Sequence, residues 1–407
     1  MELPFCFGNR DETMSQDHLM PTYARLPVAF ERGEGVWLWD SDGKRYLDAL
    51  SGIGVCNLGH AHPAVAEAIC DQASRLIHTS NLYRIPLQEH LAQRLCDLSG
   101  MQRAFFANSG AEANEAAIKL ARRYGHQRGI DTPTLIVCEG SFHGRTLATL
   151  TATANRKAQA GFEPLVHGFV RVPFDDLTAV ENAAETHRDI VAVLVEPIQG
   201  EGGVRLPSPG YLDGLRELCN RHGWLLILDE VQTGLGRTGA WFAHQHENLL
   251  PDVLTLAKAL GNGLPIGACL ARGPAAEILG PGSHGSTFGG NPLVCRGALA
   301  VLDTMERQQI PAHAARMGED LLQRLRTGLG DHPGICDIRG RGLMIAIELE
   351  RPCASLVQQA LEVGLLINVT AERVVRLLPP LIIDDDEIAH LSDTLIPLIR
   401  RFLDQSQ

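Results

Sequence analysis

Two residues that each end an apolar segment indicate the most specific chemistry in this chain. Lys258 follows the apolar residues 251–257, and Asp229 ends the apolar run 224–228. A lysine amine can form an imine with an aldehyde, and an aspartate can keep a pyridine nitrogen protonated. Together the two residues therefore predict a site for pyridoxal phosphate.

The other lysines of the chain lie in settings that suit this chemistry less well. Lys44 lies in a polar turn, Lys119 in a helical pattern and Lys157 in a polar stretch, whereas Lys258 lies between an apolar strand and the glycine-rich turn 261–265. Burial lowers the pKa of a lysine, which favours a nucleophilic amine. The alternative interpretation is a surface lysine after a strand.

Residues 108–112 predict a helix start that can bind phosphate. Ser109 and Glu112 have the S-x-x-E spacing of a capping box. Gly110 and Ala111 add little bulk in front of the first N–H groups of the helix, which attract anions. The alternative is an ordinary capped helix.

Two further loops follow predicted strands and carry side chains that suit a small-molecule site. In loop 140–146, Phe142 could cover an aromatic ring and Arg145 could bind a carboxylate with both guanidinium nitrogens. Glu196 and Glu201 lie in the next loop, where carboxylates could receive an amine or neutralise an arginine. A buried phenylalanine, a surface arginine and a polar surface loop are the alternatives.

The residues after Asp229 extend the predicted ring site. Val231 could pack on the ring, and Gln232 could reach its phenolic oxygen. The Asp229–Glu230 pair also resembles the acidic strand end of a nucleotide hydrolase, but the chain has no GxxxxGK[ST] loop. The glycine-rich loop 285–292 offers hydroxyl and amide groups for a phosphate, as a weak signal.

The elements that must position these residues predict an α/β fold. Apolar strands alternate with helical patterns from about residue 62 to 300, which is typical of a mostly parallel sheet covered by helices on both faces. Ligands bind beyond the carboxyl ends of the strands in such sheets. The predicted domains are a large domain over residues 61–300 and a smaller one formed by residues 1–60 and 301–407. The predicted strands are 103–106, 134–138, 190–195, 225–228, 253–256, 342–348 and 374–377, and helices are predicted over 65–77, 110–124, 211–221, 301–329 and 386–404.

Composition restricts the classes of protein and of partner. The net charge of −12 argues against a nucleic-acid partner. The chain has no apolar run long enough to span a membrane, and its first residues lack a secretory pattern, so a cytoplasmic protein is expected. The ten cysteines are scattered singly and are expected to be reduced thiols; disulfides or a zinc site are the lesser alternative. His60 and His62 lack a third metal ligand, and His244 and His246 are expected to be solvated.

In this order, the motifs resemble the class III (ornithine-type) aminotransferases of the fold type I pyridoxal-phosphate family, from about residue 22 to residue 380. Residues 21–23, 30–35, 78–83 and 367–370 fit best the subgroup that acts on N-acetylornithine. Ala107 and Asn262 depart slightly from the family pattern, and Arg84 is a larger departure that could alter the preferred acyl group.

The resemblance implies a role for each candidate residue. It implies a homodimer in which Lys258 is the Schiff-base lysine and proton shuttle, Asp229 pairs with the pyridine nitrogen, and Glu201 neutralises Arg376 while the amine substrate is bound. Arg145 would bind the α-carboxylate of the acetylated substrate, and Arg376 that of glutamate or 2-oxoglutarate. The remaining implied contacts are Phe142 and Val231 on the two ring faces, Gln232 on the phenolic oxygen, Gly110 and Ala111 on the phosphate, Thr287 on the phosphate from the other subunit, and Tyr23 and Ser286 beside Arg145.

The implied reaction moves the terminal amine of N2-acetyl-L-ornithine to 2-oxoglutarate. Succinylornithine, succinyl-diaminopimelate, ornithine and 4-aminobutyrate are alternative amine donors that would share the cofactor residues. A decarboxylase, an aminomutase or a non-catalytic relative on the same scaffold are further alternatives. An Arg145 site combined with a Glu201–Arg376 pair favours transamination, because that reaction needs two alternating substrates.

Overall fold

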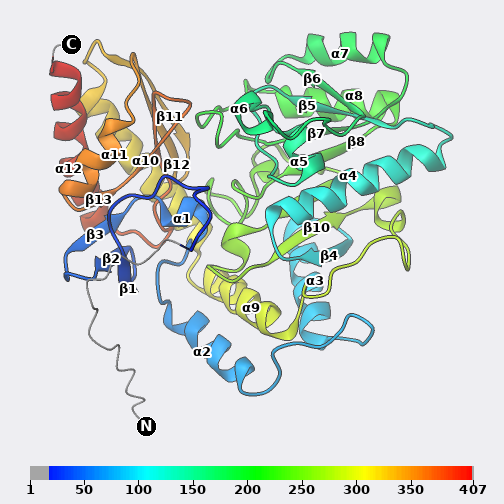
Figure 1. The fold of residues 1–407 in the computed structure, drawn as a ribbon, viewed down its shortest axis with the longest axis horizontal. Coiled ribbons are helices and arrows are strands. Elements are labelled where there is room, and N and C mark those ends of the chain that lie inside the picture. Colours follow the sequence, from blue (N-terminus) through cyan, green and yellow to red (C-terminus); the bar gives the residue numbers. More distant parts are fainter. Residues whose placement is uncertain (1–17, 406–407) are drawn as a thin grey trace.

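The structure is a computed structural model that describes residues 18–405. A seven-stranded sheet forms its largest layer (Figure 1). Its strands lie in the order β4-β10-β9-β8-β7-β5-β6. The strands from β6 across to β9 are parallel, and β10 runs antiparallel to both of its neighbours. The strands are β4 (Arg103–Ala107), β5 (Thr134–Cys138), β6 (Phe169–Val172), β7 (Ile190–Val195), β8 (Leu225–Asp229), β9 (Val253–Leu256) and β10 (Gly267–Ala271).

Helices cover both faces of this sheet. Successive strand residues accordingly pack in two different apolar clusters, one on each face. On β5, Leu135 and Val137 pack with α4, whereas Ile136 belongs to the cluster on the opposite face. Strands buried on both faces read as continuous apolar runs, which is why the sequence predicted them. Helices α4 (Gly110–Gln127) and α5 (Leu147–Ala152) cover one face, and α3 (Pro86–Ser99), α7 (Leu177–Thr186) and α8 (Tyr211–His222) cover the other.

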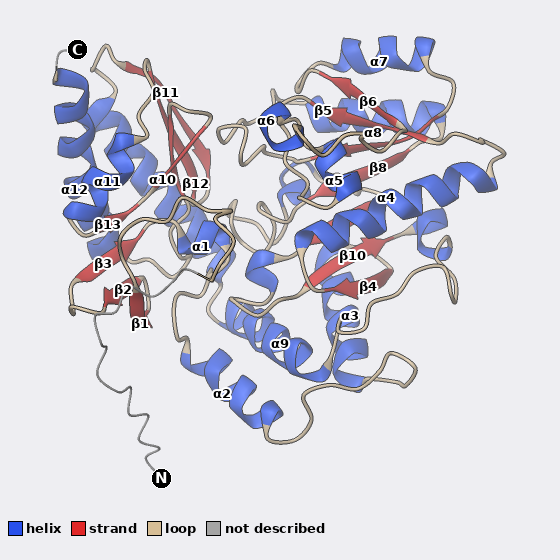
Figure 2. Cartoon of the chain, in the orientation of Figure 1, coloured by secondary structure: helices blue, strands red, loops and turns tan. Residues whose placement is uncertain are grey.

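Two four-stranded sheets lie beside the large one, in the orders β1-β2-β3-β13 and β11-β12-β15-β14. Figure 2 shows both of them at one end of the molecule, with helices α10 to α12. Strand β13 pairs with β3, so segments from near the two ends of the chain share a sheet. The division at residues 60 and 300 stays a prediction. These strands are β1 (Phe30–Glu34), β2 (Trp37–Asp40), β3 (Arg45–Asp48), β11 (Ile335–Arg341), β12 (Met344–Leu349), β13 (Leu365–Leu366), β14 (Asn368–Thr370) and β15 (Val374–Leu377).

Two predicted helices differ most from the observed ones. The helix predicted over residues 65–77 is α2 (Pro63–Ala73) and ends earlier. The helical region predicted over 301–329 is broken at Gln309, whose φ of 51° lies in the left-handed region. Pro311 explains why one helix does not continue through this point, because proline has no N–H group to donate to the Arg307 carbonyl oxygen four residues earlier, whereas it is tolerated in the first turn of a new helix. The remaining helices are α1 (Ser51–Gly54), α6 (Arg156–Gln159), α9 (Pro292–Arg307), α10 (Ile310–Leu329), α11 (Ser355–Glu362) and α12 (Asp385–Asp404).

Candidate active site

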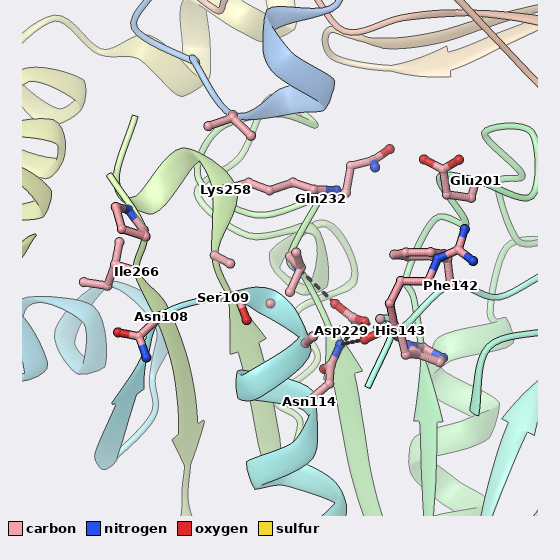
Figure 3. Close-up of a pocket in the computed structure, with 18 of the residues that line it drawn as sticks. Asn108, Ser109, Asn114, Phe142, His143, Glu201, Asp229, Gln232, Lys258 and Ile266 are labelled. Carbon is pink, nitrogen blue, oxygen red and sulfur yellow. Dashed lines mark hydrogen bonds and ion pairs between the residues drawn. The ribbon is translucent and has the colours of Figure 1, made fainter. Parts of the chain in front are cut away.

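A cavity of about 420 Å³ lies at the carboxyl ends of the parallel strands. Figure 3 shows Lys258 and Asp229 both pointing into it. Asp229 is the last residue of β8, and Lys258 follows β9, which lies next to β8 in the sheet. The predicted site residues that line this cavity are Gly110, Ala111, Phe142, Arg145, Glu201, Asp229, Val231, Gln232 and Lys258.

The start of α4 opens onto the cavity. Ser109 caps the helix by accepting a hydrogen bond from the Glu112 N–H group at 3.2 Å. The Glu112 carboxylate accepts from the Asn108 N–H group, so the predicted box closes one residue earlier than its usual form. A Cβ on Gly110 would lie 2.7 Å from Val231 Cγ1. Glycine therefore lets α4 approach the segment after β8, and the first N–H groups of the helix can face a bound anion.

Asp229 is buried and held by four donors. Its Oδ2 accepts from Asn114 Nδ2 at 2.7 Å and lies 2.8 Å from His143 Nδ1. Its Oδ1 accepts from the Val231 N–H group at 3.0 Å and from Thr255 Oγ1 at 3.4 Å. These contacts fix the carboxylate in the cavity wall, where it can bind a protonated ring nitrogen.

The sequence-based assignment missed Asn114 and His143. Asn114 lies on the buried face of α4 among alanines, and a polar residue on that face was the available signal. His143 lies in the loop 140–146, from which the sequence analysis selects only Phe142 and Arg145 as site residues. Buried polar groups need partners, so both side chains were candidates for a site.

Lys258 begins a short 3₁₀ turn, Lys258–Leu260, with a φ of 44° in the left-handed region. Burial is the main reason that its pKa falls to about 8, and the positive charge of Arg376 lowers the pKa further. Glu201, Asp229 and Glu196 oppose the decrease. Near neutral pH, a larger share of this amine is therefore unprotonated than for a solvent-exposed lysine.

The two glutamates of the loop after β7 have different surroundings. Glu196 is buried and accepts hydrogen bonds from the N–H groups of Phe142 at 2.9 Å and Gly200 at 3.0 Å. It thereby connects the two loops that follow β5 and β7. Burial above all raises the pKa of Glu196 to about 7, with a further contribution from Asp229.

Glu201 forms an ion pair with Arg376 on β15. Arg376 Nη1 lies 2.7 Å from Glu201 Oε1, and Arg376 Nε donates to Asn368 Oδ1 at 3.0 Å. Arg376 is buried, whereas Glu201 is partly exposed at the cavity wall. The structure thus brings together the two side chains that the sequence analysis paired.

Arg145 is exposed at the mouth of the cavity, and its guanidinium carbon lies 5.5 Å from the centre of the Phe142 ring. No carboxylate of residues 18–405 forms an ion pair with it. The guanidinium is therefore open to an incoming carboxylate.

Four predicted site residues do not line this cavity: Arg376, which contacts Glu201 in the cavity wall, and Tyr23, Ser286 and Thr287. Tyr23 is 75% exposed. The Ser286 hydroxyl accepts from Asn108 Nδ2 at 3.2 Å, and Thr287 is exposed beside it in a neighbouring hollow. The roles predicted for these residues stay predictions. The predicted pairing of Thr287 with a second subunit would explain its position outside its own chain's cavity.

The expectation of a solvated His244 is wrong. His244 is buried, and its Nδ1 lies 2.8 Å from Glu230, whose carboxylate also accepts from the backbone N–H groups of Ala243 and His244. Glu230 directly follows β8 and is itself buried, so it needs donors close by.

The state of the cysteines, possible metal sites and possible membrane-spanning helices can be described for residues 18–405. In that part of the chain the cysteines are free thiols, and no group of three or more His, Cys, Asp or Glu side chains is arranged to hold a metal ion. None of its helices is long and apolar enough to cross a membrane. Cys6 and the first residues of the chain, to which the secretory expectation refers, lie outside the described part.

Residues 19–399 match the family model described as "Aminotransferase class-III". The chain is 59% identical over 387 residues to a Nitrosomonas europaea protein named "Acetylornithine aminotransferase", covering 95% of this chain and 98% of that protein. It is 56% identical to a Bordetella bronchiseptica protein named "Acetylornithine aminotransferase 1", with 95% and 98% covered.

Solved structures show the same fold. The ornithine aminotransferase of Toxoplasma gondii has a TM-score of 0.92 at 36% identity, with 96% of this chain and 94% of that chain covered. The acetylornithine aminotransferase of Elizabethkingia anophelis has a TM-score of 0.85 at 36% identity, with 95% and 97% covered. Another structure of the Toxoplasma gondii enzyme has PLP, pyridoxal phosphate, at partial occupancy in its active site.

Proposed function

The chain belongs to the class III aminotransferases, and on that premise we propose that it moves the terminal amine of N2-acetyl-L-ornithine to 2-oxoglutarate, giving N-acetylglutamate semialdehyde and glutamate, a step of arginine biosynthesis. The enzyme is a pyridoxal-phosphate-dependent aminotransferase with the fold of the type I family. The choice of acetylornithine is supported by the names of relatives that are 55–59% identical over nearly the whole chain.

The residues of the cavity fit pyridoxal phosphate. Val231 leaves no room for a Cβ at Gly110, the first residue of α4, and the N-terminus of this helix suits a phosphate. The buried Asp229 suits a protonated pyridine nitrogen, and Lys258 has a lowered pKa in the same cavity. When bound, this cofactor supplies an aldehyde for the amine and a ring that stabilises negative charge on the substrate carbon.

The chain's own residues supply binding and proton transfer. Lys258 Nζ would take a proton from the carbon that bears the amine and pass it to the cofactor, and it would carry a proton in the opposite direction in the other half-reaction, for which a pKa near neutrality is suited. Asp229 would keep the ring nitrogen protonated because Asn114 and His143 hold its carboxylate in place. Phe142 and Val231 would enclose the ring, and Gln232 would donate to its phenolic oxygen.

The Glu201–Arg376 ion pair is the observation that carries the proposal of two alternating substrates. Acetylornithine presents its terminal amine to the site, whereas glutamate presents a carboxylate beside its amine. With Glu201 paired, Arg376 is neutralised and an amine can approach; with Glu201 turned away, Arg376 can bind a carboxylate. Arg145 would bind the distant carboxylate of acetylornithine, beside Tyr23 and Ser286.

We further propose a cytoplasmic homodimer in which Thr287 reaches the phosphate of the other subunit. The apolar side chains of Leu82, Tyr83 and Phe288 are 87%, 69% and 61% exposed. Large exposed apolar side chains are typical of a surface that another protein covers. Phe288 is next to Thr287, so the proposed contact and the exposed apolar group lie on the same loop. The net charge of −12 supports small-molecule substrates rather than nucleic acid.

The test is a panel of amine donors added to the purified enzyme with its cofactor. Acetylornithine alone should remove the absorption band of the lysine-bound cofactor, and 2-oxoglutarate should restore it. Lys258→Ala is the matched control and should lack the band. Faster loss of the band with 4-aminobutyrate, ornithine or a succinylated donor would contradict the choice of acetylornithine, and a wild type that never gains the band would contradict the cofactor assignment.

A further inference from the structure

Arg339 of β11 holds the backbone of the loop that carries Glu201. Its Nη2 donates to the Gly203 carbonyl oxygen at 2.6 Å, and its Nε donates to the Val204 carbonyl oxygen at 2.9 Å. The remaining nitrogen, Nη1, lies 2.7 Å from Glu348 and 2.9 Å from Asp337. One guanidinium therefore binds two consecutive peptide carbonyls while two carboxylates hold the guanidinium in place.

The loop needs such an anchor because its backbone is not in a relaxed conformation. Gly203 has a φ of 105°, and Val204 has a φ of 49°, which is unusual for a β-branched residue. With Gly202 and Gly203 in succession, the loop would have many conformations available if its external contacts were lost. Those contacts include Thr370, whose hydroxyl donates to the Glu201 carbonyl oxygen.

Arg339 and Arg376 stand in one row of the same sheet. Arg339 is paired with Ala346, and Ala346 is paired with Arg376, across β11, β12 and β15. Residues directly opposite one another in a sheet point to the same face, so both arginines extend toward the loop. Arg376 binds the side chain of Glu201, while Arg339 binds the main chain two and three residues later.

Ala346 between them leaves space for the loop. It is fully buried in the same apolar cluster as Val204, so the loop backbone packs on the sheet between the two arginines. The distance between the two arginine positions is set by the strand spacing, about 10 Å over two strands. A rigid sheet therefore determines where the backbone of Glu201 lies relative to Arg376.

We propose that Arg339 is a positioning residue that places Glu201 for its switchable contact with Arg376. This inference rests on the proposed alternation of two substrates. Arg339 does not line the cavity, so it acts through the loop rather than on the substrate. Without it, Glu201 would pair with Arg376 less often, and the positive charge of Arg376 would oppose the incoming amine.

The test compares the two half-reactions in Arg339→Met, Arg339→Lys and Arg373→Met. Arg373 Nη2 lies 2.6 Å from the same Glu348 but has no contact with the 203–204 carbonyls among the residues described, which makes it the matched control. We expect Arg339→Met to lower kcat/KM for the acetylornithine half-reaction roughly tenfold, and that for glutamate less than about threefold. Arg339→Lys should lie in between, because lysine has one nitrogen in place of a fork. Arg373→Met should leave the ratio of the two half-reactions unchanged.

A second measurement does not depend on the reaction. Amide hydrogen exchange of the cofactor-free protein should be faster for residues 200–204 in Arg339→Met, and unchanged there in Arg373→Met. In a Glu201→Gln background, Arg339→Met should not change the ratio further, because the two residues act through one contact. Each of four outcomes would overturn the proposal. Arg339→Met could lower kcat/KM equally in both half-reactions, or Arg373→Met could change the ratio of the half-reactions as much as Arg339→Met does. The effects of Arg339→Met and Glu201→Gln on this ratio could be additive, or the exchange of residues 200–204 could be unchanged in Arg339→Met.

The two proposals fail in different ways. If the wild type prefers another amine donor, the choice of acetylornithine is wrong, and the ratio is then measured with the preferred donor. The proposal for Arg339 is then judged by the same four outcomes, measured with that donor. Thermal unfolding and the cofactor band of each variant establish that the loaded fold is intact before rates are compared.

Discussion

The amine of Lys258 links reactivity to stability at the scale of one residue. Its pKa of about 8 in the folded chain lies below the ordinary value of 10.5. Between these two values the unfolded chain binds more protons than the folded chain, so this group makes stability rise with pH. Below pH 8 the folded protein carries a charged amine in partly desolvated surroundings, which costs stability.

We therefore predict that Lys258→Met stabilises the cofactor-free protein at pH 7 by about 1–2 kcal/mol, a value reduced from the full pKa shift because the side chain is partly accessible to solvent. The gain should shrink as the pH rises from 8 to 10.5. Urea unfolding of the wild type and the variant at several pH values measures it. Lys157→Met is the control, since Lys157 is exposed and should show no such trend. A gain that does not depend on pH would contradict the assigned pKa.

Sequence reasoning identified the reactive residues better than the residues that support them. Lys258 could be selected among the lysines because its neighbours in sequence are apolar, and Asp229 because it ends a strand. Asn114 could not be assigned in the same way. Its role depends on which face of α4 meets the sheet and on the 2.7 Å contact with Asp229, which joins residues distant in sequence.

At the scale of elements, the junction of β4 and α4 depends on a glycine in the neighbouring strand. Gly267 of β10 pairs with Ala107 at the end of β4. A Cβ at position 267 would lie 2.2 Å from the Ser109 carbonyl oxygen. Because the obstacle is backbone, the start of α4 would have to move, and with it the predicted phosphate contacts at Gly110 and Ala111.

Gly267→Ala should accordingly destabilise the protein by about 1–3 kcal/mol, the usual cost of overpacking, and weaken retention of the cofactor. Equilibrium dialysis against pyridoxal phosphate and thermal unfolding are the measurements. Gly280→Ala is a suitable control, because nothing lies within 4 Å of a Cβ there and its φ is not positive. Equal cofactor retention in the two variants would show that the start of α4 does not hold the phosphate.

The bounds of several strands could be predicted from local apolar runs, but the pairing between strands could not. The runs 134–138, 190–195, 253–256 and 374–377 are strands with the predicted bounds. The break at Gln309 was missed because an apolar periodicity continues on both sides of it. The row that joins Arg339 to Arg376 was beyond sequence reasoning, since it depends on the register of three strands.

At the scale of the whole molecule, the site combines two sheets. Lys258 and Asp229 come from the large parallel sheet, and Arg376 comes from a small sheet near the end of the chain. The Glu201–Arg376 ion pair connects them. In the proposed function the cofactor residues all come from the large sheet and its loops, whereas Arg376 of the small sheet takes part only in substrate binding. A substitution such as Arg339→Met should therefore change one half-reaction more than the other.

The exposed position of Thr287 leads to a prediction about the assembly. If Thr287 acts on the phosphate of the other subunit, Lys258→Ala and Thr287→Glu disable different subunits' sites. Each variant alone should be inactive. In a mixed dimer, however, the subunit that carries Thr287→Glu keeps its lysine and receives an intact threonine from its partner.

Co-expression of the two variants should therefore restore roughly one quarter of the wild-type activity, because statistical mixing makes half of the dimers hybrids and each hybrid has one intact site. Activity of separated hybrids, purified with two different tags, measures this directly. If Thr287 served the site of its own chain, every hybrid site would carry one defect and no activity would return. Recovery in the hybrids thus distinguishes a shared site from two independent sites, which the exposure of Leu82, Tyr83 and Phe288 alone cannot do.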